Sequence, residues 1–221
     1  MTKTAIQPGA RGTDSDNDTQ DQPDTTKRRQ ILAGARSAFR AHGYDGASME
    51  MVARTAGVSK GTLYVYFENK AALFRALILE ERLDQAETFL QCDDMSGDIR
   101  DQLVNVAQRF LAKMMRPERL STLRMVIGAT EQFPEFGKLL YEAGPMKGIG
   151  RLAKVLDRRV ASGDLTCPDT ELAASHFIDL CGSSLLKRAM FVPGTEFTQA
   201  EIDRVVSSAV SVFLAAYGKK A

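Results

Sequence analysis

The segment that most constrains this chain covers residues 49–67 and reads MEMVARTAGVSKGTLYVYF. Its first part has the apolar spacing of a short helix, and Ala53 is small enough for another helix to approach closely. Gly57 interrupts this spacing at a point where a turn with positive φ suits glycine. Ser59 can cap a following helix, for which Leu63 supplies the apolar side. This order of features predicts a helix-turn-helix, in which the second helix enters the major groove of DNA.

The polar face of this second helix carries candidate DNA contacts. Lys60 can reach a phosphate or the acceptor atoms of guanine, and Gly61 lets the backbone come close. We expect Thr62 and Tyr64 to read the bases. For any single tyrosine the alternative is packing in the core, and for Lys60 it is a solvated surface charge. Ser48 caps the preceding helix and leaves its N-terminus available to a phosphate, and Tyr66 and Lys70 are expected to contact the flanking DNA backbone. The complete predicted set is Ser48, Ser59, Lys60, Gly61, Thr62, Tyr64, Tyr66 and Lys70.

The longer string SMEMVARTAGVSKGTLYVYFENKAALF resembles the DNA-binding module of the TetR family of transcriptional regulators. The resemblance covers about residues 28–74, with RQILAGARSAFRAHGYDGAS as a first helix and its connection. The C-terminal half, in LRMVIGATEQFPEFGKLLYEAGP and ELAASHFIDL, resembles the AefR-like type of TetR C-terminal domain. The resemblance implies DNA-contacting roles for the matching residues. Val65, between two tyrosines, departs from the family pattern, so no particular base preference is implied.

The formal net charge of +1 hides an uneven distribution along the chain. Residues 27–75 contain nine Lys or Arg against three Asp or Glu, whereas residues 1–26 contain two against five. Positive charge therefore coincides with the predicted helix-turn-helix, where DNA phosphates would need it.

The periodicity of the chain predicts an all-α protein in three parts. Residues 1–25 are polar and Asp-rich, and we expect a disordered arm. The alternative is an arm that reaches the minor groove, with residues 27–29 as its contact candidates. Residues 26–72 form the helix-turn-helix domain, with helices over 26–41, 48–55 and 59–66. Residues 73–221 form a helical domain for effector binding and dimerisation, entered by a long helix that Asn69 caps.

Several classes of protein do not fit the sequence. Three cysteines (Cys92, Cys167 and Cys181) without C-x-x-C spacing, and two histidines, predict reduced thiols and no metal site. We expect no cofactor and no enzyme, because a phosphate-binding loop, a nucleophile elbow and paired catalytic carboxylates do not stand out. A signal peptide and a run of eighteen apolar residues are also lacking, which predicts a cytoplasmic protein without a membrane partner.

A homodimer is expected, because strong specificity usually uses two half-sites about 34–36 Å apart. The last two helices, over residues 170–190 and 198–217, are the predicted interface in a four-helix bundle. The alternative is that their small and apolar residues close the core of a single chain. These residues are Ala173, Ala174, Phe177, Cys181, Gly182, Leu185, Val205, Val206, Ala209, Val212 and Phe213.

A small-molecule effector site is predicted between the central helices, since apolar pockets with one or two polar groups are the usual ligand sites. Its candidate residues are Met114, Met125, Phe133, Phe136, Tyr141 and His176, for which plain core packing is the alternative. The resulting hypothesis is a homodimeric repressor that leaves its DNA operator when a small apolar effector binds. The alternatives are a DNA-binding regulator without a small-molecule effector and a helical enzyme that uses the cavity.

Overall fold

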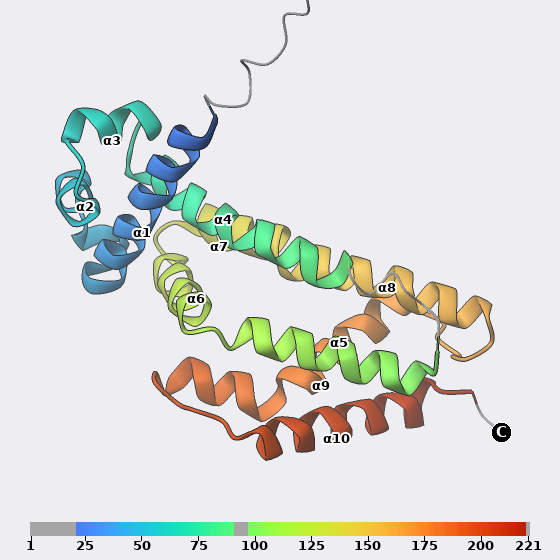
Figure 1. The fold of residues 1–221 in the computed structure, drawn as a ribbon. Helices are drawn as coiled ribbons and strands as arrows, with labels where there is room; N and C mark the ends of the chain where they lie inside the picture. The colour runs from blue at the N-terminus through green and yellow to red at the C-terminus, as the bar shows by residue number, and fades with distance from the viewer. Residues whose placement is uncertain (1–20, 91–96, 220–221) are drawn as a thin grey trace, which may run out of the picture.

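The computed structural model describes residues 21–90 and 97–219, and it describes side chains over residues 25–80 and 97–219. All regular elements within these ranges are helices, which confirms the all-α class (Figure 1). Helices α4, α7 and α8 run along one long side, α5, α9 and α10 along the other, and α1–α3 lie at one end. The helices are α1 Asp21–Gly46, α2 Met49–Ala56, α3 Lys60–Tyr66, α4 Lys70–Leu90, α5 Ile99–Met114, α6 Pro117–Ala129, α7 Pro134–Ala143, α8 Pro145–Ala161, α9 Thr170–Phe191 and α10 Gln199–Tyr217.

The first helix is longer than the sequence predicted. It begins at Asp21 rather than near Thr26, so the last residues of the expected disordered arm are helical. The remainder of that arm, residues 1–20, lies outside the described residues. At the predicted end of the helix, Gly43 has a φ of 69°, and α1 is kinked there before it continues to Gly46.

Local capping interactions set the ends of the helix-turn-helix as predicted. The Ser48 Oγ accepts a hydrogen bond from the Met51 N–H at 3.2 Å and begins α2. Gly57 follows α2 with a φ of 64°, a left-handed conformation that glycine adopts without a Cβ penalty. The Ser59 Oγ then accepts from the Thr62 N–H at 3.0 Å and begins α3.

Helices α1 and α2 are in tight contact at Gly34, a residue that was not among the predicted ones. A Cβ added to Gly34 would lie 2.5 Å from the Cβ and 2.6 Å from the Cα of Ala56. The Gln30 side chain donates to the Ala56 carbonyl at 2.7 Å and ties the same two helices together. Ala53, the predicted point of close approach, is buried as well, but Gly34 is the residue for which α2 leaves no space.

Two hydrophobic clusters hold the molecule together. The first joins α1–α4 to α6 and α7 and contains the rings of Phe39, Tyr44, Phe74 and Phe136, against which Phe133 packs. The second joins α5, α8, α9 and α10. The helix-turn-helix therefore shares its core with α6 and α7, although the sequence placed these two helices in the C-terminal domain.

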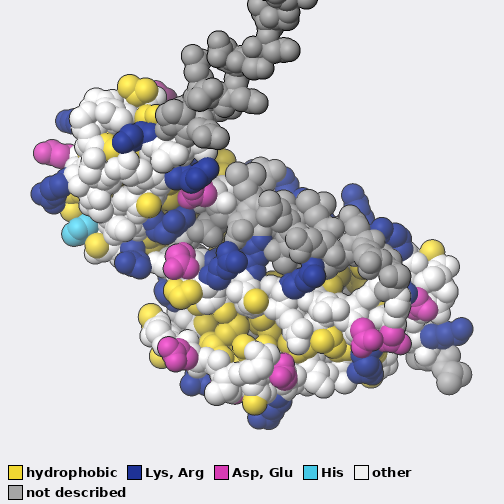
Figure 2. Space-filling model, in the orientation of Figure 1, with side chains coloured by type: hydrophobic (Ala, Val, Ile, Leu, Met, Phe, Trp, Pro, Cys, Tyr) yellow, Lys and Arg dark blue, Asp and Glu magenta, His cyan; other side chains and the backbone are white. Residues whose placement is uncertain are grey.

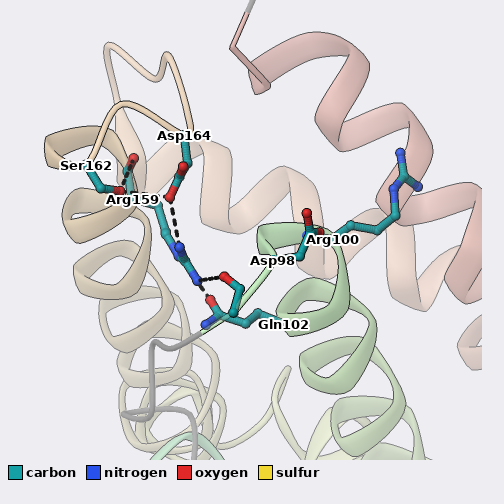
Figure 3. Close-up of polar contacts among 7 residues, drawn as sticks. Asp98, Arg100, Gln102, Arg159, Ser162 and Asp164 are labelled. Carbon is teal, nitrogen blue, oxygen red and sulfur yellow. Dashed lines mark hydrogen bonds and ion pairs between the residues drawn. The ribbon is translucent and has the colours of Figure 1, made fainter.

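A buried arginine joins the end of α8 to the start of α5, at the end of the molecule away from the helix-turn-helix (Figure 3). Arg159 is 8% exposed, and its Nη1 donates to the Asp164 carboxylate at 2.8 Å. Its Nε donates to the Gln102 Oε1 at 3.0 Å, and its Nη2 donates to the Gly97 carbonyl at 2.9 Å. The Ser162 hydroxyl also donates to Asp164, at 2.8 Å. These bonds attach the end of α8 to the start of α5.

This network predicts a specific sensitivity to acid. Hydrogen bonds from Ser162 and Arg159 lower the pKa of the Asp164 carboxyl from 3.8. Because the pKa is lower in the folded state, Asp164 stabilises the protein above about pH 4 and loses this effect as the pH falls further. We expect Asp164→Asn to reduce the fall in melting temperature below about pH 4, measured by circular dichroism.

The matched control is Asp179→Asn, at an exposed carboxylate on α9 for which no side-chain hydrogen bond is described. It should keep the acid dependence of the wild type. Identical profiles for wild type and Asp164→Asn would contradict the role given to the network.

Candidate nucleic-acid interface and internal cavity

Helix α3 is anchored on one side and open on the other. Leu63 and Phe67 are buried in the first cluster, as predicted. Lys60 and Gly61 are exposed, and Tyr64 is 45% exposed. Three of the candidate DNA contacts therefore share the outward face of this helix, and contact with DNA itself stays a prediction.

The hydroxyl groups at the start of α3 bind each other. The Ser59 and Thr62 hydroxyl oxygens are 2.8 Å apart, and Ser59 also accepts from the Thr62 N–H. The Thr62 hydroxyl thus makes one hydrogen bond inside the protein. Its methyl group and the remaining hydrogen-bonding positions of the hydroxyl are left for a partner. Ser48 has the same capping role on α2.

Lys70 has an internal role that differs from the predicted clamp on the DNA backbone. Its Nζ donates to the carbonyl oxygens of Tyr44 at 2.8 Å, Asp45 at 3.2 Å and Ala47 at 3.1 Å. The ammonium also lies 4.5 Å from the centre of the Tyr44 ring. These three bonds use all the donors of an ammonium group, so Lys70 holds the connection between α1 and α2. Tyr66 is half-buried and packs against the first cluster.

Basic side chains lie on the same end of the molecule as α3. Figure 2 shows Lys and Arg side chains spread over the helix-turn-helix end of the molecule. Near the start of α1, the Arg28 guanidinium lies 5.4 Å from the centre of the Phe67 ring, at the end of α3. Lys27 and Arg29 flank it in the sequence. The basic segment of α1 at residues 27–29 is thus next to the helix predicted to enter the groove.

A mostly apolar cavity of about 340 Å³ lies between α5, α6, α7, α8 and α9. Met114 and Tyr141, two of the predicted effector residues, line it. The Arg119 Nε donates to the Met114 Sδ at 3.0 Å, which joins α6 to the end of α5 at the cavity wall. The full lining is Phe110, Lys113, Met114, Arg119, Tyr141, Gly144, Pro145, Gly148, Ile149, Ser175, Ile178, Asp179 and Leu186.

The other four predicted effector residues do not line this cavity. Phe136 is fully buried in the first cluster, and Phe133 and Met125 pack against the same cluster. His176 is exposed, and its Nδ1 is hydrogen-bonded to the Tyr217 hydroxyl at 2.7 Å. Helical periodicity identified these side chains as inward-facing or near an apolar face. It did not show which of the two hydrophobic clusters each side chain would join. The cavity-lining residues at the junction of α7 and α8 were not predicted. The glycines among them have no side chain and therefore leave space for a cavity.

The apolar stripes of α9 and α10 close the core of the chain itself, which was the alternative reading of these residues. The buried ones are Ala173, Ala174, Phe177, Cys181, Gly182, Leu185, Val206, Ala209 and Phe213. Among the predicted interface residues, Val205 is half-buried and Val212 is 50% exposed. An interface on these helices would therefore use their outer faces.

Cys167 and Cys181 are buried and free, and burial raises the pKa of the Cys181 thiol to about 12. Over residues 25–80 and 97–219, where side chains are described, no three metal-binding side chains come together. Within residues 21–90 and 97–219, no helix combines the length and apolar character needed to cross a membrane.

Comparison with known families decides the classification. Residues 31–77 match the family model described as bacterial regulatory proteins of the tetR family. Residues 101–219 match the model of the AefR-like transcriptional repressor C-terminal domain. The chain belongs to the TetR family. The matched TetR-family regions contain all of α2 and α3 and all the residues that line the cavity.

Solved and curated relatives agree with this TetR-family assignment. A TetR-family regulator from Mesorhizobium loti is 30% identical, with a TM-score of 0.78 over 88% of this chain and 98% of that one. The flavonoid-responsive regulator FrrA is 29% identical, with a TM-score of 0.73 over 89% of this chain and 100% of its own. The transcriptional repressor AcnR of Corynebacterium diphtheriae is 32% identical over 50% of this chain.

The chain spans about half the length of the curated AcnR relatives, 53% and 57% for the two Corynebacterium proteins. These relatives are all transcriptional regulators, and this TetR-family chain is likewise a regulator and not an enzyme.

Proposed function

We propose that this protein is a cytoplasmic, homodimeric repressor that binds an operator through α3 of each protomer. The observation that carries the proposal is the two-sided α3, with Leu63 and Phe67 buried and Lys60 and Tyr64 facing outward. A short helix held in this way can place its outer side chains against base edges and phosphates in the major groove. The AcnR relatives, which are named transcriptional repressors, support the direction of control.

The dimer forms through the outer faces of α9 and α10. A groove between these helices is lined by small or apolar side chains and by three charged ones, namely Leu180, Ser183, Ser184, Leu185, Val205, Ser208 and Ala209 with Arg188, Glu201 and Arg204. The small and apolar members allow two helix pairs to approach across a two-fold axis, where the charged members can pair with the other protomer. The symmetry then presents two copies of α3 to two half-sites, which a single copy cannot do.

The effector is a small, predominantly apolar compound that occupies the cavity. A volume of about 340 Å³ lies within the usual range of ligand pockets, and the lining has few polar groups. The polar side chains that can orient a ligand by hydrogen bonds are those of Lys113, Arg119, Tyr141, Ser175 and Asp179. The relative FrrA is named as flavonoid-responsive, so flavonoids are suitable first probes.

Helix α7 provides a path from the cavity to the DNA-binding helices. Tyr141 lines the cavity, and Phe136 on the same helix has its ring 4.9 Å from that of Tyr44 in α1 and 4.8 Å from that of Phe74 in α4. A compound that moves α7 would therefore move the helices against which α3 is held. It can release DNA only if it binds the released arrangement more tightly than the DNA-bound one.

Loss of the outward groups of α3 should weaken DNA binding without unfolding the protein. Fragments bound by the wild type are first selected from a random duplex library. We then expect Lys60→Ala and Tyr64→Ala each to weaken binding of the selected duplex about tenfold or more, measured by fluorescence anisotropy. Binding by the wild type should also weaken steeply as salt rises, because bound counterions are released from the DNA.

The matched control is Lys154→Ala, which removes an exposed lysine of α8 and should leave affinity unchanged. Circular dichroism should show the same helical content in all variants. Equal effects of Lys60→Ala and Lys154→Ala, or a flat salt response, would contradict the proposed interface.

Filling the cavity should weaken the response to the effector while leaving DNA binding in place. Flavonoids are screened for release of the wild type from the selected duplex. We expect Ile149→Trp, at the cavity wall, to raise the concentration needed for release about tenfold or more, because the added ring takes the ligand's volume. Ile127→Trp, at an exposed position on α6, should respond like the wild type. Equal release of both variants would place the effector outside the cavity.

A further inference from the structure

Val65 is the most exposed large hydrophobic side chain of the helix-turn-helix among the described residues. It is 82% exposed, against 45% for its neighbour Tyr64. A single exposed apolar residue is ordinary on a protein surface. Val65, however, lies on the face of α3 opposite Leu63 and Phe67, each two residues away and buried. It therefore projects from the side of α3 that the proposed function directs toward DNA.

The surface beside Val65 projects little from α3, so the edge of a DNA base can come close. Gly61 precedes Val65 by four positions, so the two share one face of the helix. Gly61 has no side chain, and even an added Cβ would meet only the Ser59 Oγ, at 3.8 Å. Because Gly61 carries no side chain, a base edge can approach the Val65 methyl groups over this position of α3.

The chemistry of valine limits what such a partner can be. Valine has no donor or acceptor, so it gains nothing from a phosphate or from the polar atoms of a base edge. The apolar group that the major groove presents is the C5-methyl of thymine. In a helix, valine is held in one main rotamer, so a contact costs little side-chain entropy.

From these observations we infer that Val65 is a specificity-determining residue that contacts the C5-methyl of a thymine in each half-site. This inference rests on the proposed DNA-binding function and adds to it a base that the protein reads. The contact is apolar, so it contributes to base preference and not to the salt dependence of binding. The polar groups of Lys60 and Tyr64 supply attachment and readout of other positions.

The test removes the thymine C5-methyl from the DNA and, separately, the methyl groups of Val65 from the protein. In the selected duplex, each thymine is replaced in turn by deoxyuridine, which lacks only the C5-methyl. For the wild type, we expect one position in each half-site at which this change weakens binding about fourfold, the effect of about 0.8 kcal/mol for one buried carbon group. For Val65→Ala, the same change should have no effect at that position, and penalties at other positions should stay as in the wild type.

The controls separate failure of this inference from failure of the proposed function. Val65→Ala should fold normally, since the side chain is exposed and alanine favours helix. Val192→Ala, at an exposed valine beyond α9, should keep the wild-type penalties. Tight binding in which no deoxyuridine penalty depends on residue 65, or a selected site without thymine, overturns the inference alone. If the wild type enriches no sequence, the operator-binding proposal fails, and this inference fails with it.

Discussion

Truncation of Phe136 to alanine is expected to lower the free energy of unfolding by about 3–5 kcal/mol. Its side chain is fully buried, and its ring contacts those of both Tyr44 and Phe74, at centroid distances of 4.9 and 4.8 Å. Phe133 is a third neighbour, at 5.7 Å. Removal of the ring leaves a cavity where α7 meets α1 and α4, and surrounding helices relax into such a space only in part.

The measurement is urea unfolding followed by circular dichroism at a fixed protein concentration. Phe191→Ala makes the same chemical change at a side chain that is 84% exposed, and it should alter the free energy of unfolding by about 0.5 kcal/mol or less. The more conservative Phe136→Leu should fall between the two. Similar stabilities for Phe136→Ala and Phe191→Ala would show that the aromatic cluster does not join α7 to the helix-turn-helix.

Substitution of Gly34 by alanine is the second large effect, and it acts by overpacking. The new methyl group would lie 2.5–2.7 Å from the Cβ, Cα and N of Ala56, and two of these atoms belong to the backbone of α2. A side chain cannot turn aside to relieve this contact, so α1 and α2 must separate. We expect a loss of about 3 kcal/mol in the free energy of unfolding, the upper part of the usual range for overpacked cores.

The matched control is Gly128→Ala on α6, where an added Cβ meets nothing within 4 Å. At this helical position alanine should raise the free energy of unfolding by about 0.5–1 kcal/mol, so the same substitution has opposite signs at the two sites. Thermal or urea unfolding of both variants measures the difference. A stabilised Gly34→Ala protein would mean that α1 and α2 are not in the tight contact described. Weaker DNA binding should accompany the destabilisation, because α2 supports α3.

Much of the helix-turn-helix could be predicted from the sequence because its determinants are local. Ser48 and Ser59 cap helices whose N–H groups are three residues away, and Gly57 supplies the one left-handed residue between them. Leu63 and Phe67 are buried as the helical period predicted. Each of these features depends on residues within about one helical turn, so the amino-acid order determines them directly.

The cavity, the use of Lys70 and the packing of the last two helices were decided only by the tertiary structure. Lys70 binds carbonyl groups more than twenty positions earlier in the chain, and Phe136 joins the core of the helix-turn-helix instead of the cavity. Helical periodicity shows which face of a helix is apolar, but it does not show which distant element covers that face. Gly34 was missed for the same reason, since its need for space comes from Ala56 on another helix.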